Sequence, residues 1–143
     1  MKKHAPKKGS YFLVMKLKEE KALPVGRKPA VKFPGGFYCY VGSAMNSLEK
    51  RICRHISTEK RKRWHIDYFL KHAKLLDVKT IESDKRLECC LNQEVERKAD
   101  GTPMKGFGSS DCRECSAHLH HFREDPSGML EELAERWKGK AKA

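Results

Sequence analysis

The sequence predicts one α/β domain of the α+β kind, with a small central antiparallel or mixed sheet flanked by helices. Short runs of β-forming residues are interspersed with segments whose apolar residues recur at helical spacing. The 143 residues are the length of one ordinary domain, and no repeat or linker divides them. We therefore expect a basic disordered arm at 1–8, one domain at 9–138 and a basic tail at 139–143.

Three strands are expected in the first third of the chain. β-forming and apolar residues fill 11–17, whereas 18–30 is charged, contains two prolines and a glycine, and is expected to be a loop. A second strand is expected at 30–33 and a third at 37–43. The turn signal Pro34-Gly35-Gly36 between them predicts a hairpin of these two strands.

A helix is expected after the third strand. Leu48, Ile52 and Ile56 recur four residues apart and would form one apolar face. Asn46 is the expected N-cap, and Glu49 stands three residues later, as in a capping box. A basic run then precedes a second helix, expected at 64–73.

The second half of the chain continues the alternation. We expect a strand at 75–82, a helix capped by Asp84 that ends near 98, a short strand at 119–122, and a last helix beginning at Asp125-Pro126. Between them, 100–115 is rich in glycine and serine, and a loop of that length is often functional. The apolar faces of the two helices are Leu87, Leu91 and Val95, and Met129, Leu130, Leu133 and Trp137.

The charge of the chain favours a polyanionic partner. Thirty-one basic and 19 acidic residues give a net charge of +12, which is typical of small domains that bind nucleic acid. No segment approaches the roughly 20 apolar residues of a membrane span, and no secretory signal is recognisable, so we expect a cytoplasmic protein without a membrane partner. The expected nucleic-acid contacts are Lys50, Arg54, Lys60, Arg61, Lys62 and Arg63.

The six cysteines do not suggest a disulfide framework. We expect them to be reduced and most of them to be small core residues. Cys112 and Cys115 have the spacing of half a zinc site. His118, His120 and His121 follow, and His65 or His55 would be a further ligand. No second cysteine pair lies at the usual distance, so we do not expect structural zinc.

Two phenols, a guanidinium and an imidazole are predicted to converge near one end of the sheet. Tyr11 opens the first strand, Tyr40 closes the third, and Arg51 and His55 lie one turn apart on the next helix. Each has an ordinary structural explanation, as a strand aromatic, a solvated charge or a buried histidine. Their order along the chain is the informative feature.

This ordered set resembles the GIY-YIG nuclease superfamily. The first motif corresponds to Gly9-Ser10-Tyr11, the second to Tyr40-Val41-Gly42, and the helical motif to Leu48, Arg51 and His55. Trp64-His65-Ile66-Asp67-Tyr68, Gly106-Phe107-Gly108-Ser109-Ser110-Asp111-Cys112, Ser116 and His118 resemble its compact Uri-type branch, some members of which are fused to DNA-repair glycosylases.

The resemblance implies an endonuclease that hydrolyses DNA with Mg²⁺ or Mn²⁺. It makes Tyr11 the general base, Tyr40 an assisting residue, Arg51 a phosphate ligand and His55 a proton carrier or phosphate contact. The metal-ligating carboxylate would be Glu88, with Glu94 second. Further candidates are Gly42, His65, Asp67, Ser110, Asp111, Cys112 and His118.

The loop at 106–111 has two interpretations. Its backbone amides would face a phosphate if it folds over the site, with Asp111 as a second metal ligand; otherwise it is purely structural. His65 and Asp67 lie two residues apart, do not share a helical face, and are expected to make separate local hydrogen bonds.

Three departures from the family pattern bear on function. Ser10 replaces the usual apolar residue, the terminal helix has no clear asparagine, and no DNA-recognition domain is present. The last favours a structure-selective or weakly sequence-specific nuclease of DNA, or RNA, with DNA-repair proteins as candidate partners. The alternatives are a catalytically silent nucleic-acid-binding accessory module and a small zinc-stabilised interaction domain.

Overall fold

The structure is a computed structural model that describes residues 7–25, 29–57, 64–108, 115 and 117–142. None of the helices in these ranges is long and apolar enough to cross a membrane. The helices and strands, in chain order, are β1 (Gly9–Leu17), β2 (Lys21–Leu23), β3 (Val31–Phe33), β4 (Gly36–Ala44), α1 (Leu48–Ile56), α2 (His65–Leu70), β5 (Lys74–Glu82), α3 (Glu88–Lys98), β6 (Leu119–Phe122) and α4 (Ser127–Lys142).

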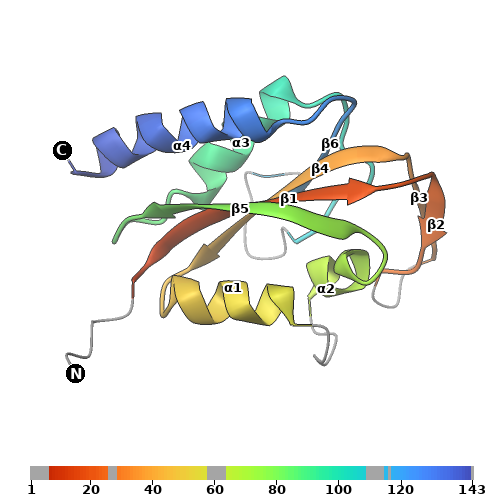
Figure 1. Cartoon of the computed structure of the whole chain (residues 1–143), viewed down its shortest axis with the longest axis horizontal. Helices are drawn as coiled ribbons and strands as arrows, with labels where there is room; N and C mark the ends of the chain where they lie inside the picture. Colours follow the sequence, from red (N-terminus) through yellow and green to blue (C-terminus); the bar gives the residue numbers. More distant parts are fainter. Residues whose placement is uncertain (1–6, 26–28, 58–63, 109–114, 116, 143) are drawn as a thin grey trace.

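A four-stranded sheet of order β5-β1-β4-β6 forms the centre of the domain, and every neighbouring pair is antiparallel. Helices α1 and α2 cover one face and α3 and α4 the other (Figure 1). Strands β2 and β3 form a separate two-stranded hairpin. The expected α+β fold class is confirmed, and the sheet is antiparallel.

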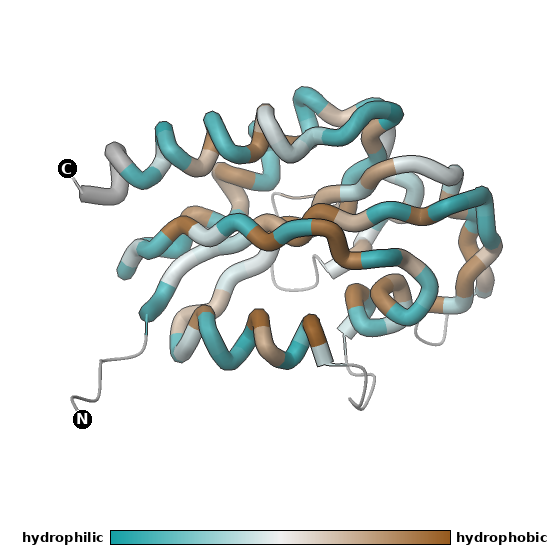
Figure 2. The backbone as a smooth tube through the Cα atoms, viewed as in Figure 1, coloured by the Kyte–Doolittle hydropathy of each residue, from teal (hydrophilic) through white to brown (hydrophobic). Residues whose placement is uncertain are grey.

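Both faces of the sheet are buried, and the alternation along β1 explains how. Tyr11 and Leu13 pack with α1 and α2, whereas Phe12 and Val14 pack with α3 and α4. Successive side chains of a strand point to opposite faces, so one apolar strand supplies both cores. The covering helices are amphipathic, and hydrophobic and hydrophilic residues alternate along α1 and α4 in Figure 2.

The hairpin expected from residues 30–43 is wrong. β4 pairs with β1 along its whole length, from Gly36 opposite Leu17 to Ala44 opposite Gly9. β3 pairs with β2, which lies inside the expected loop 18–30. Nine residues of β4 bury apolar side chains on both faces beside β1, which the three-residue β3 cannot match.

Helix α1 differs from its expected form at both ends. Its N-cap is Ser47, whose hydroxyl accepts from the Lys50 backbone N at 3.2 Å, and not Asn46. Ile56 is 59 % exposed, whereas His55 is 3 % exposed. The inward face therefore runs from Leu48 to His55, and the apolar stripe expected to end at Ile56 is wrong in its last residue.

The segment before α3 is non-helical, so α3 begins four residues after the expected cap Asp84. The Ser83 backbone N donates to Lys8 O, and its hydroxyl accepts from the Lys85 backbone N. Lys7 O likewise accepts from the Leu48 backbone N. The expected arm 1–8 is thus tied to the domain at Lys7 and Lys8, and α4 extends into the expected tail.

Strand β6 is short, and this shapes the functional region. Along the described chain, β4 pairs with β6 only from Phe37 to Tyr40. Beyond Tyr40, the Val41 backbone N donates to His118 O at 3.0 Å. Among the described strands, the last residues of β4 therefore pair with β1 alone, and Ser43 reaches Glu88 at the start of α3.

Candidate functional site

A cavity of about 570 Å³ lies where β1, β4, α1, α2 and α3 come together. It is lined by side chains from widely separated parts of the chain, among them most of the chemically capable residues expected from the sequence. The lining residues are Tyr11, Tyr40, Ser43, Met45, Asn46, Arg51, Trp64, His65, Arg86, Glu88, Cys89, Gly108 and His118.

Gly42 makes room for the first tyrosine. It is the cross-strand partner of Tyr11, so the two residues share one face of the sheet. A Cβ at Gly42 would lie 2.4 Å from both Cζ and the hydroxyl oxygen of Tyr11. The glycine of Tyr-Val-Gly is therefore required because the phenol occupies the space that any side chain would take.

The phenol of Tyr11 is bonded to an imidazole. Its hydroxyl lies 2.8 Å from His55 Nε2, and both side chains are buried. Burial raises the pKa of Tyr11 above its usual value, and the nearby Arg51 guanidinium opposes that rise. The phenol is thus protonated at neutral pH, and its oxygen and the imidazole nitrogen share one hydrogen bond.

The second tyrosine lies beside the first, under the glycine-rich loop. The ring centroids of Tyr11 and Tyr40 are 6.4 Å apart. Burial, and then the proximity of Tyr11 and Glu88, raise the pKa of Tyr40. Phe107 packs edge-on against Tyr40, and a Cβ at Gly108 would lie 3.1 Å from its ring.

The described part of the 106–111 loop lies over the cavity. Gly108 has φ +66°, a conformation that favours glycine, and its backbone N donates to His65 Nδ1 at 3.0 Å. The His118 backbone N donates to Phe107 O at 2.8 Å. These bonds favour the interpretation that the loop folds over the site; Ser110, Asp111 and Cys112 lie outside the described residues.

Arg51 is held in place by cation–π stacking on the indole of Trp64, which Arg54 also contacts. The guanidinium carbons of Arg51 and Arg54 lie 4.4 and 4.0 Å from the Trp64 ring centroid. Arg51 also donates from Nη1 to Ser43 O at 3.1 Å. Two contacts therefore fix this guanidinium at the rim of the cavity.

Arg54 has a different partner from the one expected. It forms a bidentate ion pair with the buried Asp67, with N–O distances of 2.9 and 2.8 Å. Asp67 also accepts from the Trp64 backbone N at 2.8 Å. Arg54 was expected to contact nucleic acid; its guanidinium is bound to a protein carboxylate, and the nucleic-acid contact stays a prediction. His65 and Asp67 make separate bonds, but only that of Asp67 to the Trp64 backbone N is local, since His65 bonds Gly108.

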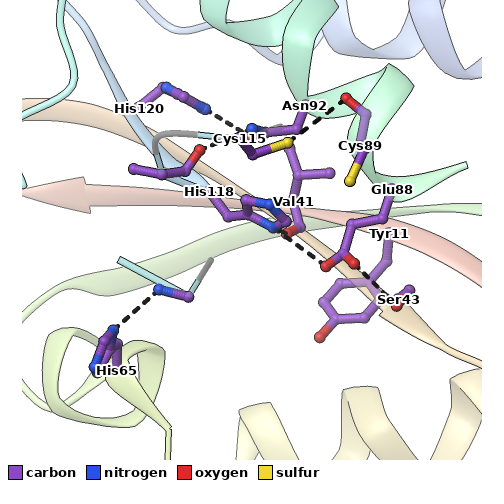
Figure 3. A network of polar contacts seen from close by, with 12 residues as sticks. Tyr11, Val41, Ser43, His65, Glu88, Cys89, Asn92, Cys115, His118 and His120 are labelled. Atoms are coloured by element: carbon purple, nitrogen blue, oxygen red, sulfur yellow. Dashed lines mark hydrogen bonds and ion pairs between the residues drawn. The ribbon is translucent and has the colours of Figure 1, made fainter. Parts of the chain in front are cut away.

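The predicted metal-ligating carboxylate reaches the cavity from α3. Glu88 lies beside Ser43 and His118, near the ring of Tyr11 (Figure 3). Ser43 Oγ donates to its Oε2 at 3.3 Å, and His118 Nδ1 lies 3.2 Å from its Oε1. The second candidate, Glu94, faces α4 instead, where it bonds Trp137 and pairs with Arg136.

The histidines proposed as zinc ligands have other partners. His120 bonds Asn92 and Thr102 through its two ring nitrogens, and His121 Nε2 lies 3.0 Å from Gly35 O. Cys115 Sγ lies 3.9 Å from Cys89 O. Within the described ranges, no group of three or more histidine, cysteine or acidic side chains is placed to hold a metal ion.

The cysteines only partly match their expected state. Cys39 and Cys115 are buried and free, as expected of core residues, whereas Cys53 and Cys90 are free but exposed. Cys89 is disulfide-bonded, which contradicts the expectation that all six are reduced. The two adjacent cysteines thus differ: Cys89 lines the cavity and is disulfide-bonded, whereas Cys90 is exposed and free.

Some site residues were not identified from the sequence. Ser43 and Arg86 line the cavity, and Trp64 stacks on both arginines. Ser43 directly follows Tyr-Val-Gly at the end of a strand, which is the only signal that marks it. Of the expected basic contacts, Lys50 is exposed, and Lys60, Arg61, Lys62 and Arg63 lie outside the described residues.

One cavity of this α+β domain thus combines two phenols, a guanidinium and a carboxylate. The model of a family described as "Domain of unknown function DUF123" matches residues 10–139, and the chain belongs to that family. No curated protein and no solved structure matches the chain.

Proposed function

We propose that this protein is a metal-dependent DNA endonuclease of the GIY-YIG type that hydrolyses phosphodiester bonds. The observation that carries the proposal is the convergence of Tyr11, Tyr40, Arg51 and Glu88 on one cavity, with His55 bonded to Tyr11. The sequence order of these residues matches the superfamily motifs, and their convergence in space is the arrangement that the chemistry requires.

The Tyr11–His55 pair supports a proton relay. A buried phenol with a raised pKa is a poor base by itself. Its hydroxyl is 2.8 Å from His55 Nε2, so it can pass its own proton to the imidazole while its oxygen takes a proton from the attacking water. The water becomes the nucleophile, the phenol is regenerated, and the proton is held on His55.

Arg51 is placed to stabilise the charge that develops on the phosphate. Its contact with Ser43 uses one nitrogen, and its guanidinium plane is supported by Trp64. The remaining N–H groups are available to phosphate oxygens, for which a planar guanidinium is well suited. Preorganised donors of this kind stabilise the transition state without reorganising during the reaction.

The donors of the cavity fit a magnesium or manganese ion. Glu88 is the only carboxylate among the described lining residues. Mg²⁺ is commonly held by one or two carboxylates and keeps several waters, whereas structural zinc needs four protein ligands. When bound, such an ion supplies Lewis-acid stabilisation and lowers the pKa of a bound water.

The substrate follows from charge. A net charge of +12 suits a polyanion, and DNA presents phosphodiesters to a cavity rimmed by Arg51 and Arg86. The single carboxylate also favours a second candidate, a catalytically silent nucleic-acid-binding accessory module, since many metal nucleases use more than one acidic ligand.

Cleavage assays separate the two functions. Branched, nicked and single-stranded DNA are incubated with Mg²⁺ or Mn²⁺ and wild type, Tyr11→Phe, Arg51→Ala or Glu88→Gln. We expect wild type to cut at least one substrate and each variant to lose on the order of 10²–10³ in rate while binding DNA. A folded wild type that binds DNA but cuts none of the panel would support the silent module.

A further inference from the structure

We propose that His118 is a positioning residue that holds the Glu88 carboxylate in place as a metal ligand. This inference rests on the proposed function. His118 directly precedes β6, is 1 % exposed and lines the same cavity as Glu88. Its Nδ1 lies 3.2 Å from Glu88 Oε1 and 3.1 Å from the carbonyl oxygen of Val41 (Figure 3).

The contacts of Nδ1 determine its protonation. A backbone carbonyl can only accept a hydrogen bond, so Nδ1 carries the hydrogen. The same nitrogen lies 3.2 Å from Glu88 Oε1, and this contact with a carboxylate favours the same tautomer. The ring hydrogen of His118 is therefore on the nitrogen that faces Glu88.

The backbone of His118 is held as firmly as its ring. Its carbonyl accepts from the Val41 backbone N at 3.0 Å, and its own N donates to Phe107 O at 2.8 Å. The residue thus bonds Val41 through both backbone and ring. A donor anchored in this way can orient a partner that has freedom of its own.

Glu88 is such a partner. It lies in the first turn of α3, and its side chain is 25 % exposed. Ser43 Oγ donates to Oε2 at 3.3 Å, a longer contact than that of a strong hydrogen bond. His118 and Ser43 each contact one carboxylate oxygen of Glu88 and leave lone pairs for a cation, and such outer contacts are usual for metal-ligating carboxylates.

The second ring nitrogen also points to more than a structural role. His118 Nε2 is buried and has no hydrogen-bond partner in the described part of the chain. Buried polar atoms are nearly always paired in folded proteins, and leaving one unpaired is costly. A histidine that served only to pack the core would destabilise the fold through this unpaired nitrogen without any benefit. A histidine that orients a ligand-binding side chain in the cavity has a functional benefit to set against that destabilisation.

Direct binding of Mn²⁺ to the full chain tests the inference without using cleavage. Manganese titrations followed by electron paramagnetic resonance compare wild type, Glu88→Gln, His118→Asn and His118→Gln. The asparagine amide reaches the position of Nδ1, and the glutamine amide reaches the position of Nε2. We expect His118→Gln to weaken Mn²⁺ binding about 10–100-fold and His118→Asn to retain most of the wild-type affinity.

His120→Asn is the matched control. His120 is a buried histidine two residues away that contacts Asn92 and Thr102 and not Glu88. We expect this variant to lose stability but to bind Mn²⁺ as wild type does. Melting temperatures of all variants separate folding effects from affinity.

The possible results distinguish the inference from the proposed function. If Glu88→Gln abolishes Mn²⁺ binding but both His118 variants bind as wild type does, His118 does not position Glu88 and the proposed function stands. Equal losses in the two His118 variants also overturn the positioning role, because only one of them removes the donor. If Glu88→Gln binds Mn²⁺ normally, the metal site itself is wrong, and both proposals fail.

Discussion

The phenol of Tyr11 packs against Gly42 on the neighbouring strand. A β-carbon on residue 42 would lie 2.4 Å from the Tyr11 hydroxyl oxygen. A methyl group there must displace either the phenol or the strand. The phenol of Tyr11, the proposed base, can therefore occupy its position only because residue 42 has no side chain.

Gly42→Ala is expected to reduce cleavage as severely as Tyr11→Phe, because the methyl group moves the phenol away from His55. Overpacking should also cost roughly 1–3 kcal/mol of stability. Cleavage rates and urea denaturation measure the two effects. Gly128→Ala is the control, since a Cβ there meets nothing within 4 Å. Wild-type cleavage by Gly42→Ala would contradict the placement of Tyr11.

Some of these residue-level features were predictable and others were not. The order of the motifs along the chain was enough to predict that four residues share one site: Tyr11, Tyr40, Arg51 and Glu88. Ser43, Arg86 and the stacking role of Trp64 were not identified, because contacts between separate elements leave no local pattern in the sequence. Ser10, the departure in the first motif, is fully buried on the opposite face from Tyr11.

At the scale of elements, an ion pair joins α1 to α2. From the sequence alone, its arginine was expected to be a surface charge. Arg54 and Asp67 lie 13 positions apart and form two short bonds. Helical spacing correctly placed Arg54 off the apolar stripe of α1. A position off that stripe does not by itself mean that the side chain is exposed to solvent. The indole of Trp64 and the α2 N-terminus close over the guanidinium.

Arg54→Ala should therefore destabilise the fold far more than Lys50→Ala. It leaves the buried carboxylate of Asp67 without its cation, which typically costs about 3–5 kcal/mol. Lys50 is exposed and its removal should leave stability nearly unchanged. Urea denaturation of both variants checks this. Equal stability of the two would show that the Arg54–Asp67 pair contributes nothing.

A second buried network joins α3 to β6. Asn92 donates to Ala117 O at 2.7 Å, and its Oδ1 lies 2.8 Å from His120 Nε2. Burial lowers the pKa of His120 from 6.5 to about 4, with a smaller opposing effect of Glu96 and a reinforcing one of His118. The folded domain thus holds His120 in its neutral form.

The sign of the resulting pH dependence follows from that lowered pKa. Below about pH 6.5 the unfolded chain binds a proton on His120 that the folded chain does not bind until about pH 4. Stability from this residue is therefore complete above pH 6.5 and lost as pH falls toward 4. Urea denaturation across this range should show a shallower loss for His120→Gln; parallel curves would contradict the network.

Local patterns predicted most elements but not their partners. Apolar alternation and helical spacing located the strands and helices within a few residues, since these patterns are set locally. The pairing of β4 with β1 rather than β3 was not predicted, because the choice depends on how much apolar surface each pairing buries. The helix start at Leu48 likewise involves a contact distant in sequence, since the Leu48 backbone N donates to Lys7 O.

For the whole molecule, charge is the property that matters most. The cavity is lined by Arg51 of α1, and the same helix carries the exposed Lys50. Helices α1 and α4 cover opposite faces of the sheet (Figure 1). Helix α4 carries Lys138. If DNA approaches the cavity, positive charge on the α1 face should contribute to binding, and equal charge on α4 should not.

The affinity for duplex DNA should consequently fall steeply with salt, with a log–log slope of about −0.9 for each phosphate neutralised. Lys50→Ala is expected to reduce that slope by about one phosphate contact, whereas Lys138→Ala removes the same charge from α4 and should leave it unchanged. Fluorescence anisotropy at several salt concentrations measures both. A slope that changes equally in the two variants would mean that binding responds to net charge alone, and a slope reduced only by Lys138→Ala would place the DNA on the opposite face of the sheet from the cavity.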